Sequence, residues 1–172
     1  MEQPSLQPVL LKDYTKSIYQ IPKIDLNVVI ETDFTEIRTK LFVTKNYQPS
    51  GTHDLSLNGE SLELIEIKID GQILEQSEYQ LSENALILHP TKDVFTVETT
   101  VRIYPEKNTQ LMGLYASKYG YFTQCEAEGF RRITFSLDRP DVLSQFTTRI
   151  QAPKDKYPVL LSNGNLTESG DL

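Results

Sequence analysis

The amino-acid sequence predicts an all-β fold, an antiparallel sandwich or barrel built from many short strands. From residue 21 to residue 103, apolar and polar residues mostly alternate with a period of two, which is typical of strands with one buried face. The candidate strands recur every 8–12 residues or so and are joined by turns that contain Gly, Asn or Asp. No long helical period occurs before residue 110. Together these observations favour an antiparallel β domain over a helical one.

The first two strands are expected on either side of a turn near residues 32–35. Ile24, Leu26 and Val28 alternate with polar residues before this turn, and Ile37 begins a second alternating stretch after it. β-Branched residues dominate both stretches. Strand–turn–strand therefore fits this part of the chain better than a helix.

Two dipeptides give the strongest turn signals in the middle of the chain, namely Asn58-Gly59 and Asp70-Gly71. Such pairs tolerate positive φ and are typical of tight turns between strands. Between the two turns, Ile65 shifts the phase of the alternation. A short apolar run at 85–88 predicts another strand, and a long alternating strand follows. One face of that strand is expected to carry Phe95, Val97, Thr99, Val101 and Ile103.

The alternation then stops, and residues 106–142 are predicted to form an irregular insertion of loops and short helical turns. Long irregular insertions in compact β domains are usually functional. Strands are expected to return at 144–153 and at 157–161, with a turn at Asn163-Gly164. Because little sequence follows that turn to supply its second arm, we expect the domain to be truncated at its C-terminal edge.

The length of 172 residues suits one domain. We expect an N-terminal arm over residues 1–17, which contains two prolines and little regular structure, and a single β domain over residues 18–172. A domain of this size buries a real hydrophobic core without disulfides or metals.

Composition excludes several classes of function. The net charge of −7 and pI of about 4.9 repel phosphate backbones, so we expect no nucleic-acid partner. A single cysteine allows no intrachain disulfide. The N-terminus lacks the pattern of a signal peptide, and no apolar stretch approaches the roughly 20 residues of a membrane span. We therefore expect a cytoplasmic protein without a membrane partner.

Few residues offer metal or thiol chemistry. A zinc site needs three or four His, Cys or carboxylate ligands at compatible spacing. The chain has two histidines, His53 and His89, both in turn-like contexts, and one cysteine, Cys125. We expect no metal site in this chain, and we interpret Cys125 as a packing thiol because no histidine lies near it in sequence.

The segment 121–142 crowds carboxylates and arginines between apolar positions. Glu126 and Glu128 are open to two interpretations. They pair with arginines such as Arg131 and hold an irregular loop in place, or one of them binds a ligand's ammonium group through a charge-assisted hydrogen bond. An acid–base pair for hydrolysis requires a defined separation between two carboxylates, which sequence spacing does not supply.

The same segment carries a family resemblance. "TQCEAEGFRRITFSLDRPDVLSQFTTRI", followed by "KYPVLLSNGN", strongly resembles the bacterial aminopeptidase N family of zinc aminopeptidases, whose catalytic domain is thermolysin-like. "SLNGESLELIEIKIDG" and "LMGLYASKYGYFTQCEAEGF" are also similar to segments of that family. The likeness covers nearly the whole chain as the N-terminal domain of such an enzyme. Ser136 departs from the pattern, where the family usually has an aromatic residue.

The resemblance implies a mostly antiparallel, saddle-like β-sandwich packed on a catalytic domain that this chain lacks. It implies that Glu126 binds the α-amino group of a peptide substrate, helped by a glutamate of the catalytic domain. It also implies that Gln124 lines the pocket for the first side chain and contacts the same amino terminus. Cys125 and Glu128 are assigned to packing and loop support. Zinc and the catalytic base belong to the downstream domain, so we expect no catalytic or metal-binding residue here and no peptidase activity from the isolated chain.

A second hypothesis is a free-standing β-sandwich that acts as a protein-interaction module without catalysis. The face meant for a catalytic domain would be exposed in that case as well. The two hypotheses differ in whether the gene continues past Leu172 into an H-E-x-x-H motif.

Overall fold

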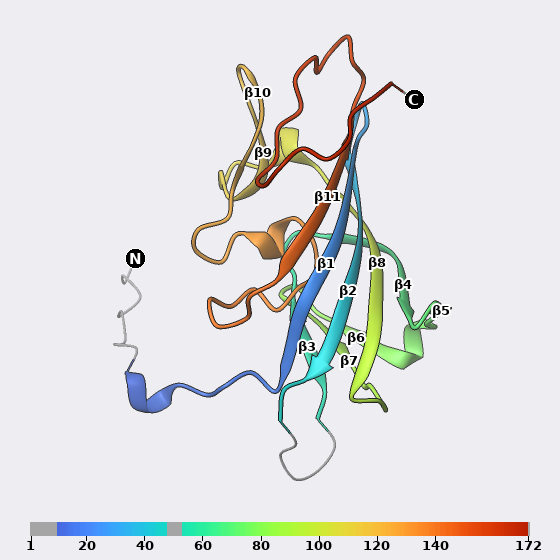
Figure 1. Cartoon of the computed structure of the whole chain (residues 1–172), viewed down its shortest axis with the longest axis vertical. Helices are drawn as coiled ribbons and strands as arrows, with labels where there is room; N and C mark the ends of the chain where they lie inside the picture. Colours follow the sequence, from blue (N-terminus) through green and yellow to red (C-terminus); the bar gives the residue numbers. More distant parts are fainter. Residues whose placement is uncertain (1–9, 48–52, 172) are drawn as a thin grey trace.

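The main layer of the fold is a long, twisted sheet (Figure 1). The computed structural model describes residues 10–47 and 53–171, and within them this sheet has six strands in the order β11–β1–β2–β8–β4–β5. Neighbouring strands are antiparallel, except that β11 runs parallel to β1. The strands are β1 (Tyr19–Ile30), β2 (Thr35–Lys45), β4 (Glu63–Ile69), β5 (Gln72–Ile73), β8 (Val94–Ile103) and β11 (Gln145–Gln151).

A smaller sheet and a hairpin complete the β structure. The smaller sheet has the order β3–β7–β6, with β3 (Leu55–Asn58), β7 (Ala85–Leu88) and β6 (Tyr79–Leu81). The hairpin pairs β9 (Gly113–Ser117) with β10 (Gly120–Gln124). The helical elements of the described residues are single 3₁₀ turns: η1 (Leu11–Asp13), η2 (Gln76–Glu78), η3 (Pro105–Lys107) and η4 (Phe130–Arg132). No helix in the described part of the chain is long and apolar enough to cross a membrane.

The all-β prediction is confirmed. Apolar and polar residues alternate because one face of each long strand is buried. The predicted face of β8 is buried from Phe95 to Ile103, and Ile37 of β2 is fully buried beside it. The leucines of β3 and β7 are buried in the same core cluster, namely Leu55, Leu57, Leu86 and Leu88. Each such side chain contributes about 1.5–3 kcal/mol by leaving water. The core also contains Phe135, which comes from the irregular insertion rather than from a strand.

The two turn signals have different outcomes. Asp70 and Gly71 have φ of 50° and 80° and connect β4 to β5, so the tight turn between strands is confirmed. Asn58-Gly59 instead leads from the smaller sheet to the large one, because β3 pairs with β7 and β4 pairs with β8. Gly59 is required there by close packing, since a Cβ atom would lie 2.2 Å from the ring of Phe135.

The phase shift at Ile65 corresponds to an irregularity in the sheet. The register of β4 against β8 shifts between Leu64 and Glu66, as in a β-bulge. Ile65 is the extra residue at this shift, and its side chain is exposed.

Two predictions about the second half of the chain are wrong. Residues 157–161 form no strand among the described residues, where β11 is the last strand. Pro158 has no N–H to give to a sheet, and Val159 and Leu161 are exposed. The insertion is also more regular than predicted, because it contains the hairpin β9–β10. The first nine residues of the predicted arm and Leu172 lie outside the described residues.

Candidate functional site

The second half of the insertion is held between the two sheets. Residues 133–136 are all buried. The hydroxyl oxygen of Thr134 lies 2.8 Å from that of Thr39 in β2 and 3.5 Å from that of Thr99 in β8. Ser136 exchanges two backbone hydrogen bonds with Asn58 at the end of β3, of 2.7 and 3.1 Å. These contacts fix the insertion to both sheets.

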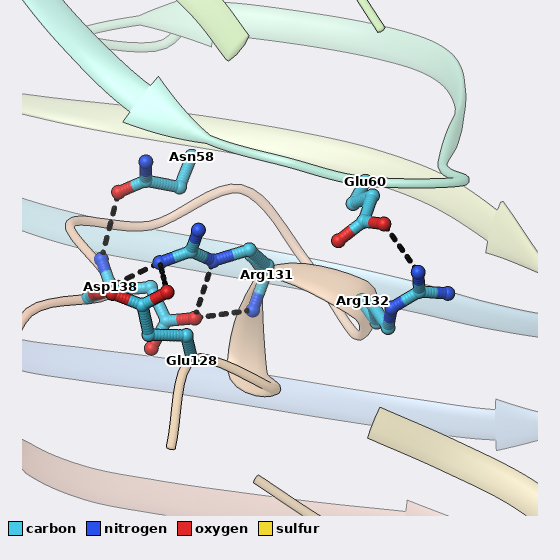
Figure 2. A network of polar contacts seen from close by, with 6 residues as sticks. All are labelled: Asn58, Glu60, Glu128, Arg131, Arg132 and Asp138. Carbon is cyan, nitrogen blue, oxygen red and sulfur yellow. Dashed lines mark hydrogen bonds and ion pairs between the residues drawn. The ribbon is translucent and has the colours of Figure 1, made fainter. Parts of the chain in front are cut away.

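An arginine–aspartate pair fixes the turn η4 to the chain that follows it (Figure 2). One carboxylate oxygen of Asp138, Oδ2, accepts hydrogen bonds from Nε and from the backbone N–H of Arg131, at 2.9 and 3.1 Å. The guanidinium also donates to the carbonyl oxygen of Asp138, at 3.1 Å. The backbone N–H of Asp138 donates in turn to Oδ1 of Asn58, at 3.2 Å. Arg132 next to it forms an ion pair with Glu60.

A second arginine–aspartate pair joins the insertion to the N-terminal segment. Arg139 donates from Nε and Nη2 to the two carboxylate oxygens of Asp141, each at 2.8 Å. The hydroxyl of Tyr14 donates to the same carboxylate at 3.0 Å. The hydrogen bonds from Arg139 are the main reason that the pKa of Asp141 lies below its ordinary value.

The loop between β10 and η4 is tight, and glycine makes it possible. The backbone N–H of Gly129 donates to the carbonyl oxygen of Cys125 at 2.9 Å. A Cβ atom on Gly129 would lie 2.5 Å from the carbonyl oxygen of Gln124, so a larger residue does not fit. The side-chain amide of Gln124 donates to the carbonyl oxygen of Glu126 at 2.8 Å. The peptide bond between Glu126 and Ala127 is cis.

Glu126 differs from the other carboxylates of the insertion. A carboxylate oxygen of Glu128 lies 3.6 Å from Nη2 of Arg131. The carboxylates of Asp138 and Asp141 lie closer to their arginines, at 2.9 Å from Arg131 and 2.8 Å from Arg139. The carboxylate of Glu126 is exposed, and among residues 10–47 and 53–171 no hydrogen bond or ion pair engages it. Gln124 is exposed beside it. The structure thus brings the two predicted site residues together and leaves one carboxylate available for a ligand.

The interpretation of Cys125 as a packing thiol fits its surroundings. Burial, and to a lesser degree the charge of Asp138, raises the pKa of this thiol above its ordinary value. A raised pKa keeps the sulfur protonated at neutral pH and makes it a poor nucleophile. His89 is engaged elsewhere, with Nδ1 2.8 Å from Asp54. Within the described residues, no group of three or more His, Cys, Asp or Glu side chains is placed to hold a metal ion.

Asn58 and Glu60 are the residues of this site that sequence reasoning missed. They lie 80 and 72 residues from their partners Asp138 and Arg132. The dipeptide Asn58-Gly59 was a signal, but it indicated a turn and not a connection to the insertion. These segments come together only because the insertion packs between the two sheets.

The fold and this arrangement define a class of protein. The sequence pattern of the family described as the Peptidase M1 N-terminal domain matches residues 15–172, and the chain belongs to that family. The sequence is 42% identical to aminopeptidase N of Caulobacter vibrioides over 167 residues, which are 96% of this chain and 19% of that protein. It is also 42% identical to aminopeptidase N of Escherichia coli K12 over 162 residues, or 93% of this chain and 18% of that protein.

Solved structures agree with the sequence relatives. The crystal structure of Legionella pneumophila aminopeptidase A in complex with aspartic acid superimposes with a TM-score of 0.87 at 35% identity, covering 94% of this chain and 19% of that one. Native leukotriene A4 hydrolase from Saccharomyces cerevisiae shares the fold, with a TM-score of 0.67 at 21% identity over 86% of this chain and 26% of that one. The chain therefore spans about a fifth of the length of the curated relatives that it matches.

Proposed function

We propose that this chain is the N-terminal domain of a zinc metalloaminopeptidase and that it binds the free α-amino group of the peptide substrate through Glu126 and Gln124. Family membership and the aminopeptidase relatives support the enzyme class. The observation that carries the residue assignment is the state of Glu126, which is exposed and unpaired among the described residues while its neighbours bind arginines.

The chemistry of the two side chains suits an ammonium group. A carboxylate offers only acceptor oxygens, and an ammonium offers three donors. The amide nitrogen of Gln124 is already used by the carbonyl oxygen of Glu126. Its amide oxygen, which also accepts hydrogen bonds, is then the atom left for a ligand. Charge-assisted hydrogen bonds of this kind contribute about 1.5–3 kcal/mol each when water is excluded.

Binding the α-amino group sets where the peptide is cut. A carboxylate at a fixed distance from the reacting centre favours substrates whose ammonium ends there, so one residue is removed at a time. The residues of this chain do not fit a zinc site of three or four ligands within the described ranges. In the proposed enzyme, the metal and the groups that cleave the bond come from outside this chain, and its own contribution is to bind and orient the substrate.

The test is Glu126→Ala in the longer protein, assayed on an unblocked alanyl substrate. We expect kcat/KM to fall by roughly 30- to 1,000-fold, which corresponds to about 2–4 kcal/mol of lost transition-state binding. The matched control is Glu128→Ala, two residues away, where we expect a change of less than about threefold because that carboxylate pairs weakly with Arg131 at the surface.

The same variants should be measured on a peptide with an acetylated amino terminus. Wild type is expected to discriminate strongly against the blocked peptide, and Glu126→Ala is expected to lose most of that discrimination. Equal activity of wild type and Glu126→Ala on the free peptide would remove Glu126 from the site.

A further inference from the structure

The loop that leads from η3 into β9 is held by one side chain, that of Asn108. This residue is partly buried, and its amide makes three hydrogen bonds to the backbone of the loop. Nδ2 donates to the carbonyl oxygens of Met112 and Leu114, at 2.7 and 2.9 Å. Oδ1 accepts from the backbone N–H of Gln110 at 3.1 Å. Asn108 therefore uses both of its donors and holds the backbone on either side of Gly113.

The loop needs this support because part of its backbone is in an unfavourable conformation. Leu111 has a φ of 57°, and Gly113 has a φ of 72°. Glycine adopts such values freely, but for leucine the left-handed region is unfavourable. Without the hydrogen bonds of Asn108, the loop is therefore expected to relax away from this conformation.

Gly113 connects this loop to the segment that carries the proposed amine-binding residues. The register of the hairpin pairs Gly113 directly with Gln124. Gly113 is buried, and a Cβ atom on it would lie 2.6 Å from Cβ of Arg132 and 3.3 Å from the carbonyl oxygen of Gly129. Gly113 therefore contacts the loop 125–129 on both sides, at Gln124 before it and at Gly129 where it ends.

The position of Glu126 depends on this backbone. Its side chain is exposed, and no described residue binds its carboxylate, so only the chain that carries it fixes where it lies. A carboxylate on a fixed backbone meets an ammonium group at one place. On a loosened backbone it samples several places, and part of the binding free energy is lost in ordering it.

We propose that Asn108 is a positioning residue for the amino group of the substrate. By holding the loop 109–112 and Gly113, it sets where Gln124 and Glu126 lie relative to the bond that is cut. This inference rests on the proposed function. The three hydrogen bonds of Asn108 go to the backbone of its own loop, so it acts on the ligand through Gly113 and the hairpin register.

The experiment is a double-mutant cycle in the longer protein, assayed on alanyl 4-nitroanilide. We expect Asn108→Ala to lower kcat/KM by about tenfold, because displaced acceptors bind the ammonium group less well. The preference for a free over an acetylated amino terminus is expected to fall by a similar factor. The double variant Asn108→Ala with Glu126→Ala should lie within about twofold of Glu126→Ala alone, because the main group that Asn108 positions is then gone.

Ser82→Ala is the matched control. The hydroxyl of Ser82 also makes three hydrogen bonds to the backbone of its own turn, with the carbonyl oxygen of Ala85 at 3.2 Å and with the N–H groups of Asn84 and Ala85 at 3.4 and 3.1 Å. That turn joins β6 to β7, away from the hairpin β9–β10 (Figure 1). We expect Ser82→Ala to change kcat/KM by less than about twofold. Asn108→Ser, which keeps a shorter polar side chain, takes the place of Asn108→Ala in the cycle if that variant does not fold.

The outcomes separate the two proposals. If Asn108→Ala keeps its kcat/KM while Glu126→Ala loses activity, Asn108 has no positioning role and the amine-binding site stands. If the losses of the two single variants add in the double variant, Asn108 does not act through Glu126 and the inference is overturned. An equal loss in Ser82→Ala overturns it as well, because any loosened turn would then have the same effect. If Glu126→Ala keeps full activity, or the longer protein does not cleave the substrate, the proposed function fails and this inference fails with it.

Discussion

The two halves of the insertion use similar residues in opposite ways. Residues 130–142 carry carboxylates that each bind an arginine, and apolar side chains such as Phe135 lie in the core. Residues 113–126 end in Glu126, a carboxylate without such a partner, and carry the ring pair of Tyr115 and Phe122, whereas Figure 2 shows the paired arginines Arg131 and Arg132. The first arrangement holds the fold together, and the second leaves Phe122, Gln124 and Glu126 exposed at the surface.

The partner of a charged side chain says more about its role than its position in a charged segment does. A carboxylate bound to a partly buried arginine has its hydrogen-bonding capacity used, and removing it leaves an unpaired charge. An unpaired exposed carboxylate contributes little to stability. Changes in the two halves should therefore act on different measured quantities.

Phe135→Ala should give the largest loss of stability. The side chain is 2% exposed and packs against Gly59, so its removal leaves a cavity that the close backbone cannot fill. We expect the free energy of unfolding to fall by about 3–5 kcal/mol, measured by urea unfolding of this chain. Phe122→Ala on the exposed half should cost less than about 1 kcal/mol, and similar losses for the two variants would contradict the division.

Asp138→Ala should cost about 2–3 kcal/mol, the next largest effect. The side chains of Arg131 and Asp138 are 21% and 14% exposed, and the variant leaves Nε and the backbone N–H of Arg131 without their shared acceptor oxygen. Glu128→Ala removes the weaker partner of the same arginine, whose own side chain is 64% exposed, and should cost less than about 0.5 kcal/mol. A larger loss for Glu128→Ala than for Asp138→Ala would reverse the assignment of the two carboxylates.

Only some of the contacts behind these expected results could be predicted from the sequence. Alternation predicted β1, β2 and β8 because burial of one strand face is a local property with a fixed period. The turn at Asp70-Gly71 was predictable for the same reason, since its φ angles depend on two adjacent residues. Family resemblance, and not periodicity, pointed to Glu126 and Gln124.

The remainder of the site depends on contacts distant in sequence. Nothing near Asn58 indicates that it accepts a hydrogen bond from Asp138. The hairpin β9–β10 was missed because glycines and aromatic residues obscure its alternation, and its inner face packs on residues as distant as Tyr157. The prediction of a strand at 157–161 is wrong because apolar residues form a strand only beside a pairing partner, and no strand of the described residues pairs with this segment.

The pH dependence of stability should show a smaller effect, centred on Asp141. Its pKa is lowered in the folded state, so its contribution is complete above the unfolded pKa of about 4 and is lost as the pH falls through the lower folded pKa. We expect wild type to lose at most about 1 kcal/mol more than Asp141→Asn between pH 5 and pH 3. Parallel pH profiles of unfolding for the two proteins would show that the pair with Arg139 does not stabilise the fold.

The smallest change in stability is expected for Glu126→Ala. The carboxylate is exposed and no described residue binds it, so its removal should alter the free energy of unfolding by less than about 0.5 kcal/mol. The same substitution is expected to cause the large loss in kcat/KM in the longer protein. A residue that holds the loop in place would lose stability and activity together, whereas a residue kept for a ligand loses activity alone. If Glu126→Ala lowers the free energy of unfolding in urea by more than about 1 kcal/mol, Glu126 is a structural carboxylate like Asp138, whatever its effect on activity.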